Sequence, residues 1–97
     1  MGVDRAEAEE VVRAELAKLR AATYSELVER LLDKQESFER VGPSGVRYTI
    51  ELDAFWDDRP SENLRVIAMV DDGSRRAFRR PLSDSFIRAP DGSFIGE

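Results

Sequence analysis

The sequence feature with the clearest chemical potential is a run of arginines at positions 75–80, which read Arg75-Arg76-Ala77-Phe78-Arg79-Arg80. Guanidinium groups fork onto phosphates and carboxylates and stack on nucleic-acid bases. One interpretation is therefore a strip that binds anions or nucleic acid, joined by Arg65 on a neighbouring strand. The other is an edge strand whose charges prevent sheet-to-sheet aggregation. Because the chain has a formal net charge of −5, which repels polyanions, we favour the guarded edge and expect no nucleic-acid partner.

Four carboxylates gather between positions 53 and 62, at Asp53, Asp57, Asp58 and Glu62. Hard cations such as Mg²⁺ and Ca²⁺ bind oxygen ligands of this type. However, the spacing differs from a calcium loop, which needs alternating oxygen ligands, a glycine and a distal glutamate. Arg59 would also neutralise part of the cluster. We therefore interpret the cluster as a solvated turn and expect neither a metal nor a cofactor.

Residues that serve as activated nucleophiles or bases are scarce. The chain has no Cys and no His, which excludes disulfides, thiolate zinc sites and His-activated serines. Its glycines lie in turn contexts and form no phosphate-binding loop. Glu51 and Asp53 would share a strand face about 7 Å apart, but alternating charges are ordinary on a solvated strand. We expect the protein not to be an enzyme.

Two amphipathic helices are predicted in the first third of the chain. Asp4 and Glu7 have the spacing of a capping box, and Thr23 and Glu26 repeat it. Apolar residues then recur at helical spacing, which predicts helices over about 4–21 and 24–33.

The remaining sequence favours strands separated by turns rich in Gly, Pro and Asp. Apolar and polar residues alternate most regularly over 46–55, which predicts one buried and one solvated face. The predicted strands cover about 36–41, 46–55, 64–70 and 74–82, followed by a terminal hairpin over about 86–95.

The pairing of the last two predicted strands depends on the turn near Gly73. A three-residue loop, Asp71-Asp72-Gly73, would pair Val70 with Ser74 and place Phe78 opposite Val66. A two-residue turn would place Phe78 opposite Ile67 and turn every later side chain to the other face. We favour the first register, because it aligns Phe78 with the apolar side chains of one face.

Helices followed by strands indicate an α+β fold in a single domain spanning residues 1–97. We expect the two helices to pack on one face of an antiparallel sheet of three or four strands, with a short C-terminal hairpin. Two short helices can cover only one face, so apolar side chains should remain on the other. Trp56 ends a strand beside Phe55 and is a typical interface anchor. The candidate interaction surface comprises Trp56, Ile67, Met69, Ala77, Phe94 and Ile95.

These features predict a small, non-enzymatic interaction or regulatory module that self-associates or binds another protein. The alternative is the anion-binding module that uses Arg65 and the arginines of 75–80. No targeting segment and no apolar run near the ~20 residues of a membrane helix is present in the sequence. We therefore expect a cytoplasmic protein without membrane contact.

Overall fold

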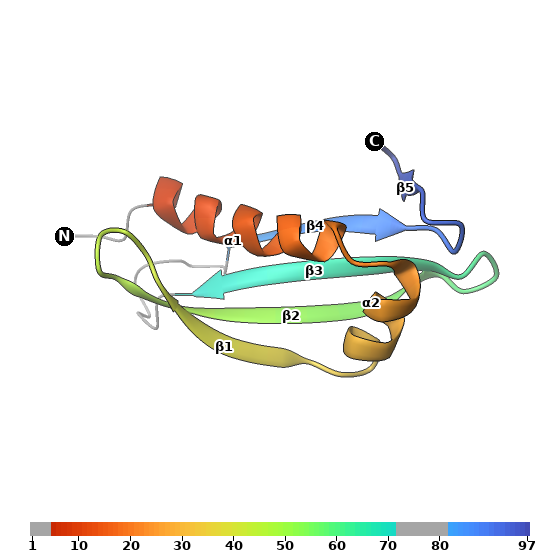
Figure 1. Ribbon diagram of the computed structural model, residues 1–97, viewed down its shortest axis with the longest axis horizontal. Coiled ribbons are helices and arrows are strands. Elements are labelled where there is room, and N and C mark those ends of the chain that lie inside the picture. The colour runs from red at the N-terminus through yellow and green to blue at the C-terminus, as the bar shows by residue number, and fades with distance from the viewer. Residues whose placement is uncertain (1–4, 72–81) are drawn as a thin grey trace.

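The computed structural model describes residues 5–71 and 82–97. The two helices come first and the strands follow, as predicted. The elements are α1 (Arg5–Arg20), α2 (Tyr24–Leu31), β1 (Glu36–Val41), β2 (Arg47–Asp58), β3 (Asn63–Asp71), β4 (Leu82–Arg88) and β5 (Phe94–Ile95). Figure 1 shows both helices lying on the same face of the sheet. The predicted α+β class is therefore confirmed.

The helices form where the apolar spacing predicted them. The buried stripe of α1 contains Ala8, Val12, Leu16 and Leu19. In α2, the hydroxyl of Thr23 accepts from the backbone N–H of Glu26 at 3.1 Å, and the Glu26 carboxylate accepts from the Thr23 N–H at 2.8 Å. This reciprocal pair confirms the second capping box. The first one includes residue 4, which lies outside the described residues.

The strands of the described residues form one antiparallel sheet in the order β1-β2-β3-β4-β5. The sheet thus has five strands, where three or four were expected. Ile50 pairs with Val70, Leu52 with Ala68, and Ala54 with Val66. These side chains point toward the helices and form the centre of the core, which also includes Tyr48, Leu64 and Phe86.

The sequence analysis paired the 64–70 strand with a strand over 74–82, and this pairing is wrong. β3 pairs with β4, so that Val70 lies opposite Leu82 and Val66 opposite Phe86. The two predicted registers at Gly73 concern Ser74 and Phe78, which lie outside the described residues. In this position the 82–88 segment places Phe86 in the core, where it is 3% exposed, and it continues directly into the hairpin with β5.

The terminal hairpin over 86–95 is confirmed. Ile87 pairs with Ile95, and Arg88 with Phe94. The Ser93 carbonyl accepts from the Ala89 N–H at 2.8 Å, and Gly92 has a φ of 93°, which its missing Cβ permits. One strand, β4, therefore serves both as the partner of β3 and as the first arm of the hairpin.

Candidate interaction surfaces

The sheet face opposite the helices, here called the open face, carries Ile67 and Met69. Ile67 lies between Asp53 of β2 and Ser85 of β4. Met69 lies in the next row, between Glu51 and Ser83. Both apolar side chains are half-buried. The sequence analysis expected both on the face away from the helices, and the pairing of β3 with β2 and β4 places them there, although not through the strand pairing that was predicted.

A third row crosses the open face at the end nearest the terminal hairpin. Phe55 lies opposite Arg65, Arg65 opposite Ile87, and Ile87 opposite Ile95. Phe55 is 43% exposed and Ile95 is 40% exposed. Because diagonal neighbours on adjacent strands lie about 7–8 Å apart, this row adjoins Ile67. We call the resulting set the open-face patch: Phe55, Ile67, Met69, Ile87 and Ile95.

Arg65 stands within the patch but its charge is neutralised. Asp57 accepts from its Nε at 2.9 Å, and its second terminal nitrogen lies 2.8 Å from the same carboxylate oxygen. Its first terminal nitrogen donates to the Ser85 hydroxyl at 3.2 Å. The Arg65 guanidinium is therefore already bound by Asp57 and Ser85. The other predicted anion-binding residues, Arg75, Arg76, Arg79 and Arg80, lie outside the described residues.

The remaining predicted interaction residues do not gather on the open face. Trp56 lies opposite Leu64 on the helix-covered side and packs partly against the core. Phe55 and Trp56 do point to opposite faces, as the strand pattern predicted. Phe94 lies on the helix side with Arg88, and Ala77 falls outside the described residues.

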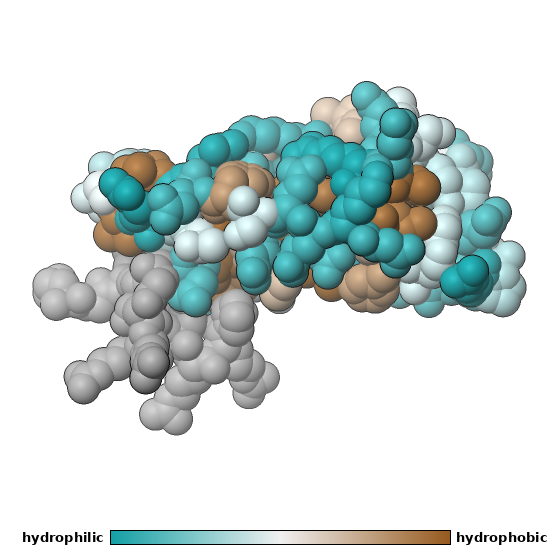
Figure 2. Space-filling view, turned by 90° about the horizontal axis from the view of Figure 1, so that it is seen from below, coloured by the Kyte–Doolittle hydropathy of each residue, from teal (hydrophilic) through white to brown (hydrophobic). Residues whose placement is uncertain are grey.

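Ion pairs run along the β1 edge, which ends in the exposed side chain of Val41. Glu36 accepts from Arg30 at 2.6 Å, and Glu39 lies 3.7 Å from Arg47. Figure 2, seen from the side of this edge, shows a mostly hydrophilic surface on which hydrophobic residues appear as separate groups. Charges on an edge strand discourage pairing with another sheet.

An arginine cluster holds the terminal hairpin to the end of α1, and the sequence analysis missed it. Arg88 donates to the carbonyls of Ala22 at 2.9 Å, Arg20 at 3.2 Å and Gly92 at 2.7 Å. The Arg20 guanidinium lies 5.0 Å from the ring centres of both Phe86 and Phe94. Its two terminal nitrogens also donate to Glu97, and this pairing lowers the pKa of the Glu97 carboxyl. The Pro-Asp-Gly turn predicted the hairpin, but no local signal predicted this attachment.

A buried carboxylate joins α1 to the β1–β2 turn, and this contact was also missed. Glu7 accepts from the Ser44 N–H at 2.8 Å, the Ser44 hydroxyl at 2.7 Å and the Tyr48 hydroxyl at 2.7 Å. These bonds, those from Ser44 foremost, lower the pKa of Glu7. A Cβ on Gly42 would lie 2.7 Å from the same carboxylate. Because Tyr48 is fully buried, a substrate could not reach its hydroxyl. The contact of Glu7 with Ser44 and Tyr48 is therefore structural, and we call it the clamp.

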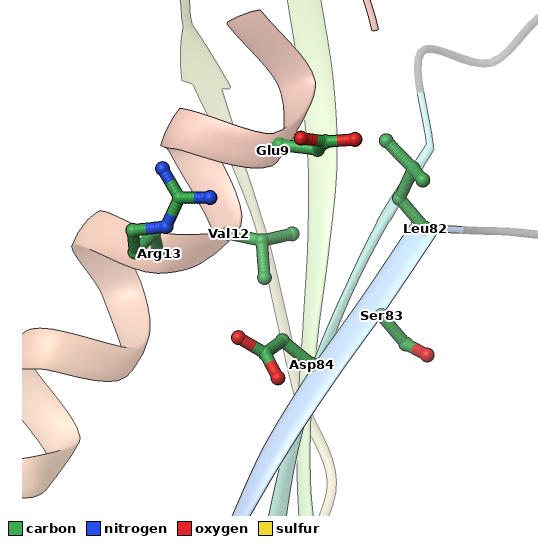
Figure 3. Close-up of a pocket in the computed structure, with 6 residues that line it drawn as sticks. All are labelled: Glu9, Val12, Arg13, Leu82, Ser83 and Asp84. Carbon is green, nitrogen blue, oxygen red and sulfur yellow. The ribbon is translucent and has the colours of Figure 1, made fainter. Parts of the chain in front are cut away.

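A small groove lies between α1 and β4 (Figure 3), with a volume of about 200 Å³. The carboxylates of Glu9 and Asp84 flank Val12 at its floor, and Arg13, Leu82 and Ser83 complete the lining. Its volume falls below the roughly 300–1,000 Å³ typical of small-molecule sites. Among the described residues that line the groove, no nucleophile is paired with a base.

The predicted acidic cluster is divided by the fold. Asp57 pairs with Arg65, whereas Glu62 lies beside Tyr24 on the helix side. Within residues 5–71 and 82–97, no three Asp, Glu, His or Cys side chains converge to hold a metal ion. Over the same residues, neither helix has the length and apolar character needed to cross a bilayer.

Comparisons with models of protein families, with curated proteins and with solved structures found no match to this chain.

Proposed function

We propose that this protein is a non-enzymatic interaction module that self-associates through its open face. The observation that carries the proposal is the open-face patch itself. Both helices cover the opposite face (Figure 1), while Phe55, Ile67, Met69, Ile87 and Ile95 project away from them. Apolar groups concentrated on an uncovered sheet face favour burial against a partner.

The charged residue inside the patch is already paired, whereas the Glu51 and Asp53 carboxylates flank Met69 and Ile67 on the same face. The paired residue, Arg65, has Asp57 as an ion-pair partner and Ser85 as a hydrogen-bond partner. An interface could therefore cover Arg65 without leaving its guanidinium unpaired, the situation that makes buried ions costly. Its aliphatic stem would add apolar area between Phe55 and Ile87.

A second copy is the occupant we propose, because a two-fold pairing brings this patch against itself. Two-fold dimers are the commonest assemblies, and each copy then covers the same residues on the other. A standard interface buries about 800 Å² per partner. Since the chain exposes 6332 Å², such a dimer would cover about an eighth of its surface, an area of the order of one sheet face.

Sedimentation velocity across concentrations from about 1 to about 100 µM tests the proposal, since a dimer with a binding free energy near −8 kcal/mol dissociates in this range. Ile67→Asp is expected to raise the dimer dissociation constant about 100-fold or more, because it buries an unpaired charge. Ala14→Asp, on an exposed position of α1, introduces the same charge and should leave the dimer intact.

Circular dichroism must show that the Ile67→Asp monomer is folded. If that variant unfolds, Phe55→Asp provides the same test at a side chain that is already 43% exposed. A wild-type chain that stays monomeric throughout, or folded patch variants that dimerise like wild type, would refute self-association. A monomer that captures a different protein through the patch would also overturn the dimer.

A further inference from the structure

A second, separate surface lies on the helix side, where the start of α2 meets the β2–β3 turn. It is a shallow groove of about 400 Å³ lined by Tyr24, Ser25, Val28, Glu29, Trp56 and Glu62. Two aromatic rings and one aliphatic side chain give it apolar walls. Its volume falls within the range of small-ligand sites. We call it the aromatic groove.

The aromatic groove is held in place by the fold. The Tyr24 hydroxyl donates to the Glu62 carbonyl at 2.6 Å, which joins α2 to the β2–β3 turn. Trp56 is positioned by its pairing with Leu64, which is fully buried. The Tyr24 ring and the backbone of Trp56 are therefore held before any ligand arrives, which reduces the entropy lost on binding.

Two glutamates line the groove, and Lys34 lies beside one of them, since its Nζ donates to the Glu29 carbonyl at 2.8 Å. The carboxylates of Glu29 and Glu62 form no ion pair within the described residues. Burial, and then the nearby Glu62 carboxylate, raise the pKa of the Tyr24 hydroxyl, so this environment disfavours added negative charge. Arg59, in the same turn, is not among the residues that line the groove.

We propose that the aromatic groove binds an arginine side chain presented by a partner protein. A guanidinium group can stack on Trp56 or Tyr24 while its fork of N–H donors reaches the Glu29 and Glu62 carboxylates. Its aliphatic stem can pack against Val28. The protein already uses arginine–aromatic contacts internally, with Arg88 lying 4.4 Å from the ring centre of Phe94 and Arg40 lying 4.6 Å from that of Phe38.

The test uses N-acetyl-arginine methylamide as the probe and the fluorescence of Trp56, the sole tryptophan of the chain, as the readout. We expect a saturable change with a dissociation constant of about 1–10 mM, as suits a single side chain. N-acetyl-citrulline methylamide has nearly the same shape without the charge, and N-acetyl-leucine methylamide is apolar. Both should bind at least fivefold more weakly.

Paired substitutions locate the site. Glu29→Gln with Glu62→Gln should weaken arginine binding at least fivefold. Glu9→Gln with Glu10→Gln makes the same change in net charge on α1 and should leave binding unchanged. Amide chemical shifts should move around Tyr24, Val28 and Trp56, and Ile67→Asp should not affect them, which separates this site from the open-face patch.

Several outcomes would overturn the inference. One is the absence of a saturable fluorescence change up to 50 mM of the arginine probe, far above the ~1–10 mM expected. Others are an equal response to the citrulline probe, tighter binding of the leucine probe, and an equal loss of arginine binding in the two double variants. Chemical-shift changes centred on another surface would also contradict it.

Discussion

Replacing Arg88 by alanine should release the terminal hairpin from the body of the protein. Arg88 lies under Phe94 and bridges three backbone carbonyls, those of Arg20, Ala22 and Gly92. It therefore joins the end of α1 to the β4–β5 turn. The same hairpin carries Ile87 and Ile95, so its attachment also positions part of the open-face patch.

The magnitude follows from these contacts. The two shorter hydrogen bonds, at 2.7 and 2.9 Å, each contribute about 1 kcal/mol, because water can partly replace a half-buried guanidinium. The longer one, at 3.2 Å, contributes less, and the contact with Phe94 adds about 0.5 kcal/mol. We expect Arg88→Ala to lower the free energy of unfolding by about 2–3 kcal/mol, which corresponds to a fall in Tm of roughly 10–20 °C.

Urea and thermal unfolding, followed by circular dichroism, measure this loss. Arg88→Lys keeps the charge, but one ammonium cannot bridge the same carbonyls, so about half the loss should remain. Arg13→Ala removes an exposed arginine from α1 and should change stability by less than about 0.5 kcal/mol. Amide exchange at Ile95 should accelerate in Arg88→Ala. A loss no larger than that of Arg13→Ala, or unchanged exchange at Ile95, would refute the attachment by Arg88.

Three further predictions concern the contact of Glu7 with Ser44 and Tyr48, the cap of α2 and one surface ion pair. Tyr48→Phe should lower Tm. Because the Glu7 pKa is below its ordinary 4.5, this carboxylate stabilises the fold above that pH and loses its contribution as pH falls through the lower folded pKa. The difference in Tm between wild type and Tyr48→Phe should therefore narrow as pH falls, and a pH-independent difference would contradict this prediction. Thr23→Ala should cost about 1 kcal/mol in urea unfolding, because it removes the cap of α2; an unchanged midpoint would show that the cap is dispensable. Arg30→Gln should cost less than about 1 kcal/mol and less still in high salt, since its pair with Glu36 is exposed; a larger, salt-insensitive loss would mean that the pair is not a simple surface contact.

Much of the fold could be predicted from local patterns. The alternation in 46–55 placed Ile50, Leu52 and Ala54 on the buried face, and the apolar spacing placed Val12 and Leu16 in the helix stripe. Such patterns work because the face on which a side chain lies follows from the period of its own element.

Partnerships between distant segments could not be predicted in this way. The Asp-Gly turn after β3 favoured a local hairpin, yet β4 pairs with β3 and buries Phe86. The choice between competing strands depends on the total apolar area each buries and on the hairpin that follows, which no local window contains. The clamp at Glu7 and the bridge at Arg88 likewise depend on segments far apart in the sequence.

The amino-acid sequence alone thus determined the two helices, the strand over 46–55 with its inward face, and the absence of Cys and His, because these are properties of composition and local period. Only the tertiary structure decided that Phe55 and Ile95 join Ile67 on the open face, while Trp56 lies with Tyr24 in the aromatic groove. The physical reason is that strand register and helix packing bring residues together through contacts that form only when the whole chain is folded.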